Sequence, residues 1–129
     1  MLNKLSKYRD NDGSLFPLSL EDMPFEVKRI FFITGVPPHT IRGKHAHRVT
    51  QQVFICVQGK IQVALGESPN IDYYILNPGE SVYIPEMTWG EQEYLEEDSV
   101  ALVLCSTEYN PNDYIYDKEQ LIREKSNEN

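Results

Sequence analysis

The chain has 129 residues, enough for one domain with a substantial core and too few for two. Its formal net charge is −8, from 12 basic and 20 acidic side chains, which argues against a nucleic acid as a general partner. A small anionic ligand remains compatible with this charge, because a few arginines can hold it.

The chain carries no sign of a membrane or an export signal. No apolar run approaches the roughly 18–20 residues that span a bilayer, and the N-terminus lacks the apolar core of a signal peptide. We therefore expect a cytoplasmic protein with no membrane partner. Cys56 and Cys105 lie in apolar, strand-like runs, which predicts buried, reduced thiols rather than a disulfide.

The first third of the chain holds one predicted strand. Residues 1–12 are polar and mixed in charge, so no element is predicted there. Ser19 opens a short helical turn that Pro24 ends. Residues 25–34 (FEVKRIFFIT) are rich in β-branched and aromatic side chains and predict a strand, and the two prolines in 35–39 predict a loop.

Short strands separated by turns fill most of the remaining chain. They are predicted over 41–47, 53–57, 61–65, 71–76, 81–84, 88–95 and 99–106. The tight turn at Gly59 predicts that 53–57 and 61–65 pair as a hairpin. This pattern of short strands predicts an all-β sandwich or barrel with one concave mouth for a ligand. Residues 117–125 (DKEQLIREK) predict a short charged helix or a frayed tail.

Two of the three histidines, His45 and His47, are separated by one residue in a predicted strand. Residues i and i+2 of a strand lie on the same face, about 6.5–7 Å apart, so both imidazoles would face one space. Two bases with pKa values near neutrality can either hold a metal or move protons. The residues alone leave both functions open.

The residues around the histidines have a recognisable spacing. It runs Gly43-x-His45-x-His47, four residues, Gln52, six residues, Gly59, and later Gly79, five residues, Pro85. This spacing resembles the two signature motifs of the cupin superfamily, whose fold is a double-stranded β-helix, or jelly-roll barrel. Metal-binding cupins have a glutamate at the position of Gln52 and a third histidine near the position of Trp89. A catalytic metal usually takes three protein ligands, so these departures favour proton transfer, and we expect no metal and no cofactor.

A closer resemblance covers about residues 15–122. It rests on the stretches 27–32, 42–59, 79–85, 98–106 and 109–115. These stretches look like the nucleotide-sugar 3,4-ketoisomerases, WxcM-like cupins that act on dTDP-4-keto-6-deoxyglucose. Two places depart from that family: Tyr116 stands where it usually has arginine, and Phe31 and Phe32 stand where tyrosines are common.

The resemblance implies a single cupin domain over 1–129, with its core at about 15–116 and a helix or tail over 117–129. It implies a cofactor-independent isomerase that acts on a dTDP-linked 4-keto-6-deoxyhexose. It also implies a homodimer, often with exchanged N-terminal strands. The product would go to an aminotransferase in the synthesis of 3-amino-3,6-dideoxyhexoses for surface polysaccharides.

Moving a ketone from C4 to C3 requires a proton to leave C3 and one to reach C4, through an enediol or enediolate. His45 and His47 are the predicted catalytic residues. One imidazole can move the proton between the two carbons, and a second group must protonate or stabilise the sugar oxygens. The sequence does not divide these roles between them. Arg42 is a candidate for the diphosphate or the enediolate oxygen, provided that a bulge at Gly43 turns it toward the histidines. Gln52 would orient a histidine or bind a sugar hydroxyl.

Three further residues complete the predicted substrate-binding set. Arg29 would reach a phosphate, and Tyr83 and Trp89 would stack on the nucleotide. Each also has a plainer interpretation, because Arg29 can be a strand-face cation and the two aromatic residues can belong to the core.

Three other functions stay open at this stage. An epimerase also removes a proton beside a ketone of the same kind of substrate. A non-catalytic sugar-binding cupin would bind the nucleotide sugar without turnover. A metal-dependent dioxygenase would use the histidines as ligands.

Overall fold

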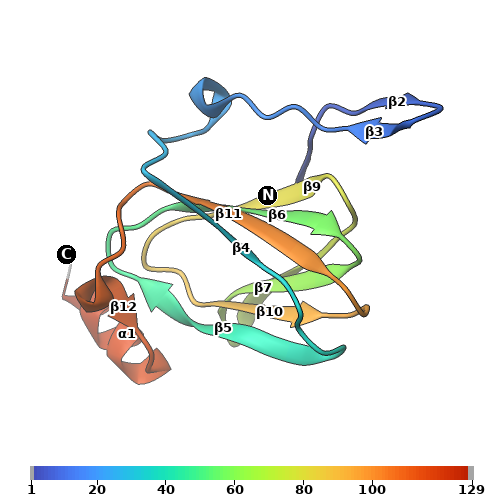
Figure 1. Cartoon of the computed structure of the whole chain (residues 1–129). Coiled ribbons are helices and arrows are strands. Elements are labelled where there is room, and N and C mark those ends of the chain that lie inside the picture. Colours follow the sequence, from blue (N-terminus) through green and yellow to red (C-terminus); the bar gives the residue numbers. More distant parts are fainter. Residues whose placement is uncertain (1, 128–129) are drawn as a thin grey trace.

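The computed structural model of the chain describes residues 2–127, which form two facing sheets, a small hairpin and one α-helix (Figure 1). The elements are β1 (Leu2–Lys4), β2 (Tyr8–Asp10), β3 (Gly13–Leu15), η1 (Leu20–Asp22), β4 (Arg29–Ile33), β5 (Thr40–His47), β6 (Gln52–Gln58), β7 (Ile61–Glu67), β8 (Asn70–Leu76), β9 (Glu80–Ile84), β10 (Gly90–Tyr94), β11 (Val100–Cys105), η2 (Pro111–Asp113), β12 (Tyr114–Ile115) and α1 (Lys118–Ser126).

Each of the two main sheets has five antiparallel strands. The first has the order β1-β9-β6-β11-β4 and the second the order β12-β5-β10-β7-β8. Their inner faces enclose the main core, which contains Phe54, Ile61, Leu76, Val82 and Val103. This architecture confirms the predicted all-β jelly-roll with a short C-terminal helix.

Both sheets are also covered in part on their outer faces. In β6, Phe54 and Cys56 point into the main core, whereas Val53 and Ile55 belong to an outer cluster under the N-terminal segment. This explains why β6 is an apolar run rather than an alternating one. The second sheet is covered by α1, whose buried Leu121 packs in a separate outer cluster with Ala46, Met87, Trp89 and Ile115.

The predicted hairpin between 53–57 and 61–65 is wrong. The first of these segments lies in β6, which pairs with β9 and β11, and the second lies in β7, which pairs with β8 and β10. The turn at Gly59 therefore carries the chain from one sheet to the facing sheet. A short turn between two apolar strands is compatible with either arrangement, because each strand can satisfy its backbone on other partners.

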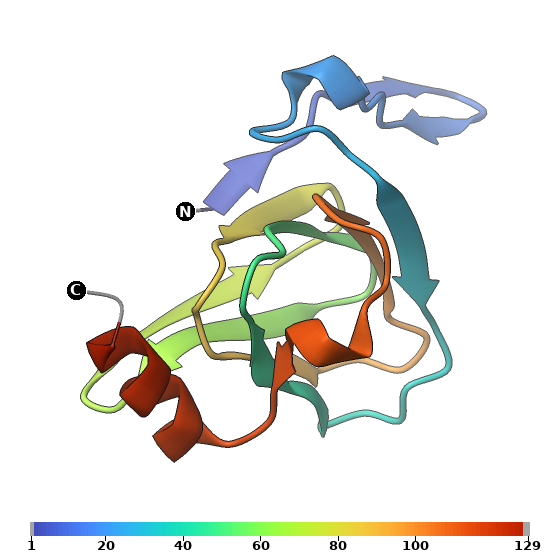
Figure 2. The same ribbon diagram turned by 90° about the vertical axis from the view of Figure 1, so that its left-hand side faces the viewer.

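The N-terminal region contains strands where none was predicted. β1 pairs with β9, and β2 and β3 form a hairpin with exposed side chains that projects away from both sheets (Figure 2). The strand predicted over 25–34 shortens to β4, because Phe25 and Val27 pack on the outer face of the first sheet instead.

The remaining expectations mostly hold. η1 forms the short turn after Ser19, although the Ser19 side chain makes no capping hydrogen bond. α1 begins after Asp117, whose side chain accepts a hydrogen bond from the Glu119 amide at 3.0 Å; the last two residues of the predicted tail lie outside the described residues. Cys56 and Cys105 are buried free thiols. None of the helices within 2–127 has the length and apolar character needed to cross a bilayer.

Two adjacent residues of β8 test the assignment of inner and outer faces. Leu76 is fully buried in the main core, whereas Ile75 is half exposed on the outer face. We expect Leu76→Ala to lower the free energy of unfolding by about 2–5 kcal/mol, because it leaves a cavity. The matched control Ile75→Ala should change it by only about 0.5 kcal/mol. Equal losses in urea denaturation would contradict this placement.

Candidate active site

The histidine pair lies on β5 and faces the space between the two sheets. Strand alternation puts His45 and His47 on one face and Ala46 on the other, where it packs under α1. The two imidazole rings are 4.9 Å apart between centroids and lie edge to face. The predicted convergence of the two rings is therefore present.

A bulge in β5 brings Arg42 to the same side. In the ladder between β10 and β5, Gly90 pairs with His45 and Glu91 pairs with Gly43. Lys44 is therefore an extra residue in β5. Gly43 adopts φ +89°, and a Cβ atom there would lie 2.8 Å from Gln92 Oε1. A residue with a side chain would thus be strained and crowded at this position. In a regular strand Arg42 would point to the face opposite the histidines. The extra residue turns it to their face, as predicted from Gly43.

Arg42 and His45 open onto one cavity of about 300 Å³ between the sheets. Its walls are formed by residues from six strands and the segment after β12, namely Phe31, Ile33, Arg42, Gly43, His45, Gln52, Phe54, Gln92, Val103, Tyr114 and Tyr116. Arg42 and Tyr116 are exposed, whereas Gln52 is buried and donates a long 3.5 Å hydrogen bond to Cys105 Sγ. The cavity therefore combines an exposed cation with buried polar groups, as a polar anionic ligand requires.

His47 is buried against a carboxylate that the sequence did not single out. Its Nδ1 lies 2.8 Å from Asp113 Oδ2. The same carboxylate accepts hydrogen bonds from the Thr50 hydroxyl and, at 2.7 Å, from the Val49 amide. The Thr50 oxygen in turn accepts from the Thr107 hydroxyl at 2.6 Å. These bonds hold Asp113, and through it His47, in a defined orientation.

The partners fix the tautomers of both imidazoles. A backbone carbonyl can only accept, so His45 Nδ1 donates its proton to Gly43 O at 2.9 Å. Burial alone would raise the pKa of Asp113, but the hydrogen bonds from Thr50, Val49 and His47 outweigh it and lower that pKa. His47 Nδ1 therefore donates to an ionised carboxylate. Both histidines are left with an unprotonated Nε2, which is the form that accepts a proton.

Burial lowers the pKa of both His45 and His47, despite the hydrogen bonds to Gly43 and Asp113 that act in the opposite direction. The neighbouring His45 ring and the Arg29 guanidinium lower the pKa of His47 further. His47 Nε2 is buried and has no hydrogen-bond partner within residues 2–127. Such an orphaned polar atom is uncommon in a native structure and is typical of a site that awaits a ligand.

Arg29 lies behind the cavity wall rather than in it. Its guanidinium packs between the rings of Phe31 and Tyr109, at 5.4 and 5.5 Å, and its Nη2 is 3.5 Å from Cys105 Sγ. Its neighbours Phe31 and Tyr114 line the cavity, whereas Arg29 itself is not among the lining residues. Arg29 thus contributes charge near the histidines rather than an open phosphate contact.

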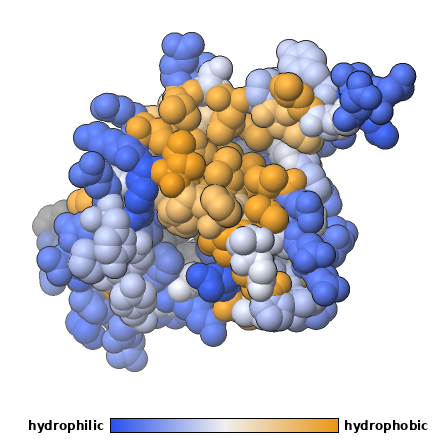
Figure 3. Space-filling model, viewed as in Figure 1, coloured by the Kyte–Doolittle hydropathy of each residue, from blue (hydrophilic) through white to orange (hydrophobic). Residues whose placement is uncertain are grey.

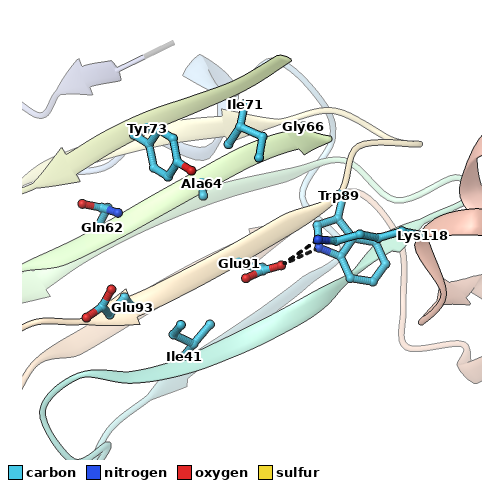
Figure 4. A pocket seen from close by; sticks show the side chains of 10 residues that line it. All are labelled: Ile41, Gln62, Ala64, Gly66, Ile71, Tyr73, Trp89, Glu91, Glu93 and Lys118. Atoms are coloured by element: carbon cyan, nitrogen blue, oxygen red, sulfur yellow. Dashed lines mark hydrogen bonds and ion pairs between the residues drawn. The ribbon is translucent and has the colours of Figure 1, made fainter. Parts of the chain in front are cut away.

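Tyr83 and Trp89 are not brought to the cavity. The Tyr83 ring packs 6.5 Å from Phe25 on the outer face of the first sheet, and its hydroxyl donates to Gln51 Oε1 at 2.6 Å. Trp89 lies on the outer face of the second sheet, where its Nε1 donates to Glu91 at 2.8 Å beside Lys118 (Figure 4). The groove there has a volume of about 260 Å³, and neither histidine of the pair is among its lining residues.

The site is poorly suited to hold a metal. Within residues 2–127 no group of three or more His, Cys, Asp or Glu side chains is arranged to ligate an ion. The Nδ1 atoms of both histidines are occupied, and Gln52 supplies only a neutral amide. The absence of a cofactor stays a prediction.

Asp113, Tyr114 and Gln92 are the site residues that sequence reasoning missed. Tyr114 packs over both imidazoles, 5.2 Å from His45 and 4.4 Å from His47 between centroids. It reaches them because β12 pairs with the end of β5, in the register Tyr114 to His47. The only available signal was the place of residues 109–115 in the family resemblance, since strand pairing over such a separation leaves no local pattern.

The lowered pKa values predict how stability depends on pH. The unfolded chain takes up histidine protons near pH 6.5, before the buried imidazoles do, so the free energy of unfolding should fall as the pH drops below about 6.5. In NMR titrations, His45 and His47 should show midpoints below about 6.5. The His45→Asn/His47→Asn double variant should lose much of the slope in this range. Midpoints above 6.5 would contradict the assigned neutral state.

The chain matches a known protein family along nearly its whole length. The family model described as WxcM-like, C-terminal (FdtA) matches residues 1–126. A protein of Aneurinibacillus thermoaerophilus named TDP-4-oxo-6-deoxy-alpha-D-glucose-3,4-oxoisomerase is 32% identical over 120 residues, which cover 89% of this chain and 86% of that protein.

Solved structures agree with this match. QdtA, a sugar 3,4-ketoisomerase from Thermoanaerobacterium thermosaccharolyticum in complex with TDP, has a TM-score of 0.90 and 33% identity, covering 98% of this chain and 94% of that one. A histidine-to-asparagine variant of QdtA, in complex with TDP-4-keto-6-deoxyglucose, also has a TM-score of 0.90. A 3,4-ketoisomerase from Helicobacter canadensis has a TM-score of 0.89 and 34% identity, covering 98% and 96%. The chain therefore belongs to the WxcM-like (FdtA) family.

Proposed function

We propose that this protein is a sugar 3,4-ketoisomerase that converts TDP-4-keto-6-deoxyglucose to a TDP-3-keto-6-deoxyhexose without a metal or an organic cofactor. The observation that carries this proposal is a pair of neutral imidazoles, one of them paired with a carboxylate, beside a cavity with an exposed arginine. Family members of similar sequence bear that activity in their names, which supports the same chemistry here.

The reaction moves two protons and leaves the overall charge unchanged. The C3–H proton must reach C4, and the O3–H proton must reach O4, while the double bond passes through an enediol or enediolate. One neutral base can serve each transfer by accepting a proton and returning it to the neighbouring atom. Two imidazoles with unprotonated Nε2 atoms match this requirement.

We assign the carbon proton to His47 and the oxygen proton to His45. Asp113 stabilises the imidazolium that His47 becomes, and a carbon acid needs the stronger base. The Nε2 atom of His47 is buried without a hydrogen-bond partner in residues 2–127, next to the His45 ring that lines the cavity, and a substrate atom would supply that partner. His45 is held only by a neutral carbonyl and lines the cavity, where it suits an exchange between sugar oxygens.

The other predicted residues divide between binding and support. Arg42 at the cavity mouth would bind the diphosphate, since a guanidinium forms bidentate contacts with phosphate oxygens. Gln52 and Gln92 would hydrogen-bond the sugar hydroxyls and the enediolate. The Tyr114 and Tyr116 rings stack in parallel, 5.7 Å apart, and offer an apolar wall to the hexose or the base.

The histidine roles can be tested by substitution. Asn keeps polarity and hydrogen bonding but does not titrate near neutrality, so His45→Asn and His47→Asn should each lower turnover by roughly 10²–10⁴-fold while the protein stays folded. The measurement is incubation with TDP-4-keto-6-deoxyglucose followed by NMR of the sugar ring, which also gives the C4 configuration of the product. In deuterated water His47→Asn should lose deuterium exchange at C3, whereas His45→Asn should retain it.

Several outcomes would contradict these assignments. Near-wild-type turnover by both variants would show that the histidines are structural. A product altered in configuration but not in the position of its ketone would identify an epimerase. Tight binding of the substrate without any product would identify a sugar-binding protein.

We further propose that the protein is a homodimer that works in the cytoplasm as one cupin domain. β4 is an open edge of the first sheet, and Ile30 and Phe32 are exposed on it. Apolar side chains gather over this sheet and the neighbouring N-terminal segment (Figure 3). A second copy would cover this surface and could receive the projecting β2–β3 hairpin, since an isolated two-stranded hairpin has little stability. The buried free thiols fit a reducing compartment.

A charge placed in the apolar surface should separate the dimer. Phe32 and Tyr73 are both aromatic and about two-thirds exposed, but Tyr73 lies on the outer face of the other sheet. We expect light scattering to give twice the mass of one chain for the wild type and for Tyr73→Glu, and the mass of one chain for Phe32→Glu. A wild-type protein that stays monomeric across micromolar concentrations would refute the dimer.

A further inference from the structure

We propose that Arg48 is a positioning residue, which together with Glu124 of α1 holds Asp113 in place against His47. This inference rests on the ketoisomerase function proposed above and extends its site to the C-terminal helix. Arg48 follows directly after His47 in the chain, and Glu124 lies in the second half of α1.

The Arg48 side chain joins three parts of the molecule. Its Nε and Nη2 atoms donate to the two carboxylate oxygens of Glu124 at 2.8 and 2.9 Å, which is a bidentate ion pair. Its Nη1 donates to the carbonyl oxygens of Asn112 at 2.6 Å and Tyr114 at 3.2 Å. Those carbonyls belong to the residues on either side of Asp113.

The backbone of Arg48 adds a further contact. Its amide donates to the carbonyl of Asp113 at 2.8 Å. One residue therefore binds three consecutive carbonyls around the carboxylate that pairs with His47. The segment is short, since η2 and β12 together span residues 111–115, and β12 pairs with β5 over only two residues.

Glu124 is what keeps the guanidinium in this orientation. Its carboxylate also accepts a hydrogen bond from Gln120 Nε2, one turn earlier in α1, at 3.0 Å. The helix itself is anchored by the buried Leu121 in the outer cluster beneath β5 and β12. The path from the helix to the imidazole thus runs through Glu124, Arg48, the segment around Asp113 and the Nδ1–H of His47.

A lysine would not reproduce this arrangement, because it has a single nitrogen and lacks the planar fork that reaches both a carboxylate and two carbonyls. The substitution Arg48→Lys is therefore informative even though it keeps the charge. Substitution to methionine removes every side-chain donor and keeps the apolar stem, while the backbone amide bond to Asp113 is retained.

The test compares Arg48→Met, Arg48→Lys and Glu124→Gln with the control Arg123→Met, which removes a cation from the residue beside Glu124. We expect kcat to fall about 10–100-fold in Arg48→Met and Arg48→Lys, and less in Glu124→Gln, with KM nearly unchanged, as is usual when an orienting partner is lost. The control should keep the wild-type kcat. Thermal melting establishes that each variant is folded.

Proton NMR gives a readout that does not depend on activity. The His47 Nδ1–H bonded to Asp113 should give a low-field resonance in the wild type and in Arg123→Met. This resonance should shift or broaden in the Arg48 variants. If Arg48→Met does not fold, Arg48→Lys and the helix variant Glu124→Gln, at a half-buried position, carry the test by the same two measurements.

The outcomes separate the two proposals. A wild-type resonance and a wild-type kcat in folded Arg48→Lys and Glu124→Gln would overturn the positioning role while leaving the ketoisomerase intact. A resonance that depends on Arg48 in a protein without turnover of TDP-4-keto-6-deoxyglucose would support the positioning role and refute the proposed reaction.

Discussion

The pairing of β12 with the end of β5 is the contact on which the site depends. It is only two residues long, in the register Tyr114 to His47 and Ile115 to Ala46. One strand face then places Tyr114 over the imidazoles, and the other sends Ile115 into the cluster under α1. The residue just before the strand, Asp113, reaches His47. Because the ladder is so short, its register must be held by groups outside it, which are the Arg48 contacts and the packing of the helix.

The sequence predicted those parts of the fold and site that depend on neighbouring residues. Strand alternation was enough to place His45 and His47 on one face, and the glycine at position 43 suggested the bulge that turns Arg42 inward. Most strands were also found from their apolar and β-branched runs. These signals are local, so they can be recognised without knowing which strands pair with one another.

What the sequence could not predict depends on distant partners. The strand after Gly59 was expected to pair with β6, but it crosses to the facing sheet. The residues of the turn are compatible with both arrangements and do not indicate which one forms. Tyr83, on β9, and Trp89, just before β10, lie where an outer cluster covers part of the sheet, so their apolar character does not tell which face they occupy. Asp113 meets His47 only through a pairing 66 residues apart. β1, β2 and β3 are short and mostly exposed, so they lack the alternating pattern by which a strand is recognised.

The crossing between sheets at Gly59 has a consequence for how the chain folds. Strands next to each other in sequence do not pair there, and β6 finds its neighbours only in β9 and β11, while β1 pairs with β9 near residue 81. Ordering such a long stretch of chain before any of these contacts forms is entropically costly, and folding is correspondingly slow for all-β topologies of this kind. During synthesis, β1 and β6 emerge well before their partners. The apolar side chains of β6 therefore stay unpaired until most of the chain has left the ribosome, which makes this the stage most exposed to aggregation.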